Sequence, residues 1–337
     1  MVKIDWNKFI TEFESAINLT DYISENKGNG YRFSRNVSAK NLTTIATGGV
    51  VALLCEVASI DALRSLISHC HKKNIRRRFI GNGSNVVISD SGLPNELVIK
   101  LTSKEKPIEV SLDPLNLSRL TFSNSRPANT LRGFRISAAS SMIGLSRQFS
   151  ALGLSGFEFA AGIPGTVGGA LRMNAGAHGK SFSEIILSVQ LLDEVGNLKN
   201  FSLENLKFEY RHVNIPKNFT VISVDVVLSE EDVSIVQKRR KDALNYRKET
   251  QPLTQPSSGS VFKNPSNDIS AGYLLENVGL KGFKFGGIQF SELHANWLVK
   301  IDPAAKSSEV KYLVSLAKQK VMEVHDIELK EEMIFWD

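Results

Sequence analysis

With 337 residues, the chain is long enough to form two or three domains with separate hydrophobic cores. Apolar residues make up 42% of the chain and charged residues 23%, a composition typical of a globular protein. The longest apolar run, Val50 to Cys55, is too short to cross a bilayer, and the acidic residues Asp5, Glu12 and Glu14 are not typical of a secretory leader. We therefore expect a cytoplasmic protein without membrane insertion.

The net charge of +6 favours anionic partners. The densest basic run, residues 72–78, could bind nucleic acid, but it is more typical of a helix C-terminus, where cations suit the helix dipole, followed by a strand. We therefore expect no nucleic-acid partner. The two cysteines, Cys55 and Cys70, match no metal-binding spacing, which predicts buried free thiols and no metal site.

In chain order, the apolar pattern predicts strands and helices in no strict alternation, which indicates α+β domains without internal repeats. Residues 1–36 are mostly polar, with a turn at Gly28, and are predicted to form an N-terminal extension. A strand at 50–57 leads into a helix capped by Ser59. Residues 102–130 are rich in Ser, Asn and Pro, which predicts a long connection. The other predicted strands are 78–80, 86–88, 134–138, 185–192, 219–228 and 327–336, and the other helices are 142–152, 231–246, 271–278 and 307–324.

A glycine-containing loop, Gly81-Asn82-Gly83-Ser84-Asn85, separates the predicted strands 78–80 and 86–88. Rossmann-type dinucleotide loops and nucleotide-triphosphate loops both open a helix, and the second kind ends in Gly-Lys-Ser/Thr. Here a strand follows and that ending is missing. The loop therefore belongs to neither class.

Six glycines fall within the eighteen residues from Gly162 to Gly179, and Pro164 constrains one turn among them. Ordering so many glycines has a large entropic cost. Bare backbone N–H groups that approach an anionic or flat ligand would offset this cost. The alternative is a set of tight turns between strands. Small apolar residues between the glycines, such as Ile163 and Val167, favour a buried loop.

Taken one at a time, the candidate catalytic residues carry weak signals. Ser260 lacks the flanking glycines of a nucleophile elbow and alone indicates a turn, while Arg211 alone indicates a solvated strand end. In the strand predicted at the C-terminus, Glu328 and Glu332 share one face and Glu331 takes the other. One of these carboxylates could be partly buried beside the apolar run at 333–336, which would raise its proton affinity. The alternative is that all three are ordinary charged groups on the surface.

Taken together, six motifs in order resemble the UDP-N-acetylenolpyruvoylglucosamine reductase (MurB) family, flavoenzymes of peptidoglycan precursor synthesis. The resemblance extends from Leu42 to Phe335. The motifs are Gly81 to Asn85, Ala161 to Gly179, Phe208-Glu209-Tyr210-Arg211, Gly259-Ser260-Val261-Phe262-Lys263-Asn264-Pro265, Ser291-Glu292-Leu293-His294-Ala295-Asn296 and Leu329-x-x-Glu332.

The resemblance implies a two-subdomain FAD-binding fold of the p-cresol methylhydroxylase type, followed by an α+β substrate-binding domain. The expected bounds are 1–36 for the extension, 37–103 and 104–230 for the FAD-binding subdomains, and 231–337 for the substrate-binding domain. It further implies that backbone N–H groups of the first motif hold the FAD pyrophosphate and that the glycine stretch lines the flavin. The implied cofactor-binding residues are Gly81, Asn82, Gly83, Ser84, Asn85, Gly162, Ile163, Pro164, Gly165, Gly168, Gly169, Asn174 and Gly176.

The family's reaction implies roles for five further residues, three in the chemistry and two in substrate binding. NADPH gives a hydride to the flavin, and the reduced flavin passes it to C3 of the enolpyruvyl group of a UDP-sugar, which yields UDP-N-acetylmuramate. Negative charge then spreads from C2 into the carboxylate, and Arg211 and Glu332 match the residues that stabilise it. Ser260 matches the serine that supplies the proton to C2, and Tyr210 and Asn264 match substrate-binding positions.

Two departures from the family pattern leave alternatives open. Lys330 and Glu331 replace the usual Glu-Pro before the last glutamate, so Glu331 is a second candidate for the catalytic carboxylate. Thr250 stands where relatives often carry a lysine, and Lys248 is its candidate substitute. The short interval before Gln251 resembles the form of the family that lacks an inserted tyrosine-bearing loop. Two alternative functions stay open. The protein could be an oxidase or dehydrogenase of the same FAD fold with a different substrate, or a non-catalytic relative that binds a UDP-sugar or a flavin.

Overall fold

The computed structural model describes residues 4–18, 30–103, 105–112 and 127–337. The chain divides into two compact units. The first comprises Met1–Ser34, Leu53–Gly81 and Asn95–Leu244, and the second comprises Arg35–Ala52, Asn82–Pro94 and Asn245–Asp337. In the described part of the chain, no helix is both long and apolar enough to cross a membrane.

The N-terminal part of the chain builds a four-stranded sheet in the order β1-β2-β5-β3. Strands β3 and β5 run parallel, with Arg77 opposite Leu97. Two predictions are confirmed here: the strand at 50–57 forms, and the Ser59 Oγ caps the next helix by accepting a hydrogen bond from the Ala62 N–H at 3.4 Å. The elements are β1 (Tyr31–Ser38), β2 (Val50–Val57), α2 (Ile60–Lys72), β3 (Arg77–Ile80) and β5 (Leu93–Leu101).

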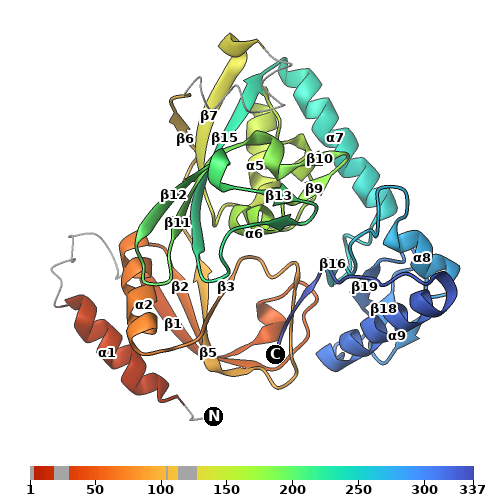
Figure 1. Ribbon diagram of the computed structural model, residues 1–337, viewed down its shortest axis with the longest axis horizontal. Coiled ribbons are helices and arrows are strands. Elements are labelled where there is room, and N and C mark those ends of the chain that lie inside the picture. Colours follow the sequence, from red (N-terminus) through yellow and green to blue (C-terminus); the bar gives the residue numbers. More distant parts are fainter. Residues whose placement is uncertain (1–3, 19–29, 104, 113–126) are drawn as a thin grey trace. The chain divides into compact units, whose positions relative to one another are not determined.

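The N-terminal residues contain a helix, α1 (Trp6–Asn18), that packs beside α2 (Figure 1). Its Phe9 and Phe13 are buried, and the Phe13 ring lies edge-on to Tyr31 with centroids 5.2 Å apart. Both phenylalanines also contact the ring of His69 on α2. Burial lowers the pKa of His69, which keeps this aromatic cluster uncharged near neutral pH. The turn predicted at Gly28 lies outside the described residues.

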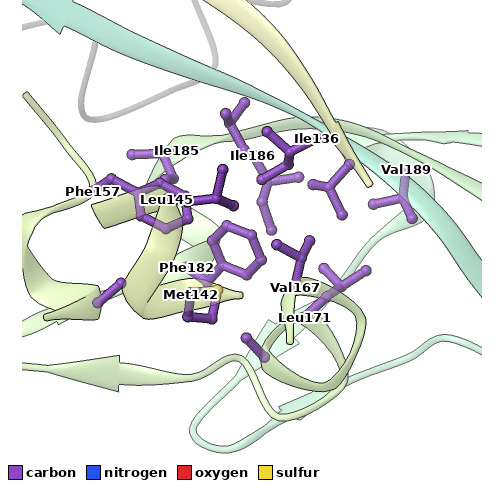
Figure 2. Packing of buried hydrophobic residues seen from close by; sticks show 14 of the residues in the cluster. Ile136, Met142, Leu145, Phe157, Val167, Leu171, Phe182, Ile185, Ile186 and Val189 are labelled. Atoms are coloured by element: carbon purple, nitrogen blue, oxygen red, sulfur yellow. The ribbon is translucent and has the colours of Figure 1, made fainter. Parts of the chain in front are cut away.

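A second sheet has the order β12-β11-β15-β7-β6, with β8 paired to β15. Helices α5 and α6 lie against one face of it (Figure 1). Its alternating side chains Ile136, Val189 and Val224 enter the core shared with these helices, and Figure 2 shows part of this core. On the opposite face Arg135 pairs with Asp225 at 2.7 Å. The elements are β6 (Ile108–Val110), β7 (Leu131–Ser137), α5 (Met142–Ala151), β8 (Leu154–Ser155), α6 (Val167–Arg172), β11 (Ile186–Leu192), β12 (Leu198–Ser202) and β15 (Thr220–Glu230). Strand β6 lies within the predicted long connection, of which residues 113–126 are outside the described part.

The second unit contains a sheet in the order β16-β19-β18-β17 and a parallel pair, β4 with β20. Helices α8 and α9 supply Leu274, Leu275, Val310 and Leu313 to its core. The C-terminal strand is shorter than predicted, since only residues 334–336 pair as a strand; the segment before it is held by isolated hydrogen bonds. The elements are β4 (Val86–Ile88), β16 (Ser257–Ser260), α8 (Ala271–Asn277), β17 (Lys284–Phe285), β18 (Ile288–Phe290), β19 (Trp297–Lys300), α9 (Ser307–His325) and β20 (Ile334–Trp336); α7 (Val233–Thr250) includes residues of both units.

Cys55 and Cys70 are both buried and free, as predicted. Burial raises the pKa of both thiols, that of Cys70 to about 12. Within the described residues, no group of three or more His, Cys, Asp or Glu side chains could hold a metal ion. The two cysteines therefore act as small apolar core residues.

Candidate active site

The loop from Gly81 to Asn85 connects β3 to β4 without an intervening helix, as predicted. Gly83 has φ +64°, and a Cβ there would lie 2.7 Å from the Cα of Thr43. The Thr44 N–H donates to the Gly83 carbonyl at 3.1 Å. A side chain at Gly83 is excluded by its φ and by this packing. At Gly81, a Cβ would run into the hydroxyl of Thr166, the residue that caps α6.

The glycine stretch from Gly162 to Gly179 is not one loop, because it contains the short helix α6. The Gly168 N–H donates to the Ala138 carbonyl at 2.9 Å, and a Cβ on Gly168 would lie 3.1 Å from that of Ala138, so this glycine allows α6 to sit tightly on the end of β7. The prediction of a continuous buried loop was therefore wrong in its middle. The helix forms because Thr166 caps it by accepting a hydrogen bond from the Gly169 N–H at 3.5 Å.

The end of the stretch is a tight hairpin. His178 and Gly179 both have positive φ, +55° and +72°, between the paired strands β9 (Gly176–Ala177) and β10 (Lys180–Ser181). Two consecutive positive φ values are typical of a type I′ turn, which favours glycine for backbone reasons alone. For Gly179 the alternative prediction of a turn between strands is therefore confirmed.

Tyr210 and Arg211 form the two-residue loop of another hairpin, between β13 (Phe208–Glu209) and β14 (His212–Val213). Arg211 has φ +56°, a conformation that turns usually assign to Gly or Asn. Its Nη2 donates to the Gly176 carbonyl at 3.2 Å, and its guanidinium carbon lies 5.1 Å from the centroid of the Tyr210 ring. The arginine expected to bind charge is thus held at the glycine stretch in a strained backbone conformation.

The hairpin is joined to the glycine stretch by Asn174, which is 7% exposed. Its Nδ2 donates to the Glu209 carbonyl at 3.0 Å, and its Oδ1 accepts from the Ser183 N–H at 3.1 Å. We predicted cofactor binding for Asn174 from the resemblance, and this remains a prediction. The observed contacts show an additional structural task, because the side chain connects the backbone before Arg211 to the turn after the stretch.

We expect Arg211→Gly to be more stable than Arg211→Ala, because both variants lose the guanidinium and only glycine relieves the positive φ. An L-residue in the left-handed region costs about 1–2 kcal/mol. The greater freedom of glycine in the unfolded chain offsets about 0.4–1 kcal/mol of this, which leaves a difference between about 0 and 1.6 kcal/mol. Thermal unfolding of the two variants at equal FAD content measures it. A glycine variant that unfolds at a lower temperature than the alanine variant would contradict this expectation.

In the second unit, Ser260 ends β16, opposite Trp297 on β19. The pairing of these strands is irregular between Ser257 and Ser260, where Gly259 has φ +76°. Ser260 is half-buried, and Asn264 is exposed, with its Oδ1 accepting from the Ala271 N–H at the start of α8 at 3.1 Å. The serine therefore lies at a bulge, where the backbone turns its side chain away from the regular strand alternation.

The two candidate carboxylates have different surroundings. Glu331 is exposed and pairs with Lys318 of α9 at 3.0 Å. Glu332 is half-buried; its N–H donates to the Val261 carbonyl at 2.8 Å, and its carbonyl accepts from the Asn85 Nδ2 at 2.9 Å. Glu332 therefore belongs to a segment hydrogen-bonded both to the loop that follows Gly81 and to the residue after Ser260.

The structure thus brings Ser260, Glu332 and Asn85 together within the second unit, and Arg211, Tyr210 and Gly176 within the first. Thr250, which stands where relatives often carry a lysine, is the last residue of α7. Its hydroxyl donates to the Tyr246 carbonyl at 2.8 Å. Residue types and spacing indicate no task for Asn174 beyond the cofactor and none for Asn296, although both residues belong to motifs shared with the family.

Two family models match the chain. A model described as FAD binding domain matches residues 51–202, and one described as the C-terminal domain of UDP-N-acetylenolpyruvoylglucosamine reductase matches residues 251–336. UDP-N-acetylenolpyruvoylglucosamine reductase of Bacillus subtilis is 35% identical over 301 residues, which cover 88% of this chain and 92% of the relative. The same-named protein of a Synechococcus species is 36% identical over 306 residues, which cover 90% of each chain.

A solved structure shares the fold. The crystal structure of UDP-N-acetylenolpyruvylglucosamine reductase from Thermus caldophilus aligns with a TM-score of 0.72 and 29% sequence identity, and the alignment covers 91% of this chain and all of that one. The predicted fold class, an FAD-binding fold of the p-cresol methylhydroxylase type followed by an α+β C-terminal domain, is confirmed. With relatives above 30% identity along most of its length, the chain belongs to the UDP-N-acetylenolpyruvoylglucosamine reductase family.

Proposed function

We propose that the chain binds FAD and uses NADPH to reduce the enolpyruvyl group of UDP-N-acetylglucosamine enolpyruvate to UDP-N-acetylmuramate, in the cytoplasm. The observation that carries this proposal is a backbone hydrogen bond that links Ser260 to Glu332. The carbonyl of Val261, the residue after the serine, accepts from the Glu332 N–H at 2.8 Å. Both residues lie within residues 251–336, which the model of the reductase's C-terminal domain matches. This pair lies outside the FAD-binding match, which supports a reductase over other flavoenzymes of the same fold.

The residues present fit an FAD pyrophosphate. At Gly81 and Gly83 the space a Cβ would take is already filled by neighbouring atoms, so the loop offers its backbone to a ligand without side chains in the way. We propose that the cofactor is bound by residues of both glycine-containing segments. These are Gly81, Asn82, Gly83, Ser84, Asn85, Gly162, Ile163, Pro164, Gly165, Gly168, Gly169, Asn174 and Gly176. When bound, FAD accepts a hydride from NADPH and delivers it to the substrate.

The chain's own residues would stabilise the negative charge that forms on the substrate and supply the proton that completes the reaction. Hydride addition at C3 of the vinyl ether leaves negative charge between C2 and the carboxylate, and the Arg211 guanidinium and the Glu332 carboxyl group would stabilise it. The Ser260 hydroxyl would donate its proton to C2 and complete the saturated ether. Tyr210, which is 52% exposed, and Asn264 would contact the UDP-sugar. The domain division at residues 36, 103 and 230 stays part of this proposal. Its last boundary lies between the two family matches, at residues 51–202 and 251–336.

The two half-reactions test the proposal separately. Purified protein should be yellow, and NADPH should bleach the flavin absorbance under anaerobic conditions. Addition of the enolpyruvyl UDP-sugar should then restore the oxidised spectrum and yield UDP-N-acetylmuramate. Bleaching without reoxidation by this sugar would point to a flavoenzyme with another acceptor, and a colourless protein that takes up no FAD would point to a non-catalytic relative.

A further inference from the structure

The side chain of Asn296 is hydrogen-bonded twice to the backbone of a single residue, Phe262. The Phe262 N–H donates to Oδ1 at 2.9 Å, and Nδ2 donates to the Phe262 carbonyl at 2.8 Å. Asn296 is 3% exposed, and its own carbonyl accepts from the Val261 N–H at 2.9 Å. The planar amide, with a donor and an acceptor side by side, therefore takes the place of a strand partner for Phe262.

The strand needs this support because regular pairing stops at the serine. Strand β16 ends at Ser260 after an irregular step in its pairing with β19. Beyond Ser260, the Val261 N–H still donates to the Asn296 carbonyl, but among the described residues the regular pairing with β19 does not continue. Buried backbone groups that lose their partners cost about 1–3 kcal/mol each. The amide of Asn296 satisfies both backbone groups of Phe262, and so keeps the chain extended just after Ser260.

On their other edge, Val261 and Phe262 contact the segment that contains Glu332, the proposed catalytic carboxylate. The Val261 carbonyl accepts from the Glu332 N–H at 2.8 Å, and Phe262 pairs as an antiparallel bridge with Glu331. Residues 261–262 are thus held between Asn296 and the C-terminal segment. Ser260 is joined to them covalently and Glu332 through a hydrogen bond, so a shift of this short segment moves both groups.

We propose that Asn296 is a positioning residue that sets where Ser260 and Glu332 stand for proton donation and charge stabilisation at the substrate; this rests on the proposed function. Asn296 is itself held by its N–H, which donates to Nδ1 of His294 at 3.2 Å. Burial lowers the pKa of His294, so its ring stays neutral and Nδ1 remains an acceptor near neutral pH. This assigns a task to the motif from Ser291 to Asn296.

Asn296→Asp is the test, because a carboxylate keeps the acceptor for the Phe262 N–H and loses the donor for its carbonyl. At high pH, where the new carboxyl group is ionised, the reoxidation of reduced flavin by the enolpyruvyl UDP-sugar should slow by about 100-fold, as for misplacement of a reacting group by about 1 Å. Reduction of the flavin by NADPH should stay within about threefold of wild type. As pH falls and the new carboxyl group takes a proton, it again presents a donor beside an acceptor, and sugar-dependent reoxidation should recover.

Wild-type protein measured at each pH corrects for the titration of the groups that surround the segment, which are His294, Lys263, Glu331 and Glu332. Asn296→Leu, which offers neither donor nor acceptor, is the matched control and should show the loss without recovery at low pH. If the aspartate variant fails to retain FAD, Asn296→Ser, which removes the second hydrogen bond without adding charge, should show the same selective loss.

A slowing of both half-reactions by the same factor at every pH would overturn the inference, since it would indicate a merely structural residue. Wild-type sugar turnover in Asn296→Asp at high pH would overturn it as well. The proposed function fails by a different result: it falls if the wild-type protein, once reduced by NADPH, is not reoxidised by the enolpyruvyl UDP-sugar, whatever the Asn296 variants do.

Discussion

Ser260→Ala is expected to reduce flavin with NADPH at the wild-type rate and to lose about 10²- to 10⁴-fold in reoxidation by the enolpyruvyl UDP-sugar, the usual contribution of a positioned proton donor. The substitution removes only the hydroxyl, because the backbone of Ser260 remains paired with Trp297 and that of Val261 with Asn296. Anaerobic stopped-flow absorbance of the flavin measures the two half-reactions one after the other.

The neighbouring Ser258→Ala is the matched control. Ser258 is fully buried, and its hydroxyl has no hydrogen-bond partner among the described residues, so its removal should leave both half-reactions near wild type. Equal losses in the two half-reactions of Ser260→Ala would contradict the acid role. So would a Ser258 variant as slow as the Ser260 variant, since the loss would then come from disturbance of β16.

Glu332→Ala is expected to lower sugar-dependent turnover by about 10²- to 10³-fold, the range found when one group that stabilises developing negative charge is removed. The half-buried Glu332 is hydrogen-bonded through its own backbone to Asn85 and Val261. Steady-state turnover with NADPH and the sugar, at saturating concentrations of both, measures the loss. Flavin content and reduction by NADPH should remain close to wild type.

Glu331→Ala supplies the control for the adjacent carboxylate. Its side chain is exposed and pairs with Lys318, and surface ion pairs of this kind contribute about 0–1 kcal/mol to stability. We expect full activity and a small change in the unfolding midpoint. The opposite result, an inactive Glu331 variant beside an active Glu332 variant, would assign the catalytic carboxylate to Glu331 and contradict the placement argued from the backbone contacts.

Local patterns predicted most elements well and failed where tertiary contacts decide. The helix after Ser59 and the strand at 50–57 follow from a cap and an apolar run, which act over a few residues. The C-terminal segment looked like a strand from 327 to 336, but pairing with β4 extends only over 334–336, because a strand needs a partner along its length. Helix α6 was missed because its glycines are poor helix formers, and its tight packing on β7 compensates.

The sequence by itself determined the family and the reaction, because six motifs in order depend only on residue types and spacing. It also identified Arg211, Ser260 and Glu332 as candidates. Only the tertiary structure shows that Glu331 and Glu332 have different surroundings, since these come from α9 and from the segment after Ser260. The same holds for Asn296: hydrogen bonds between residues 34 positions apart leave no local pattern in the chain.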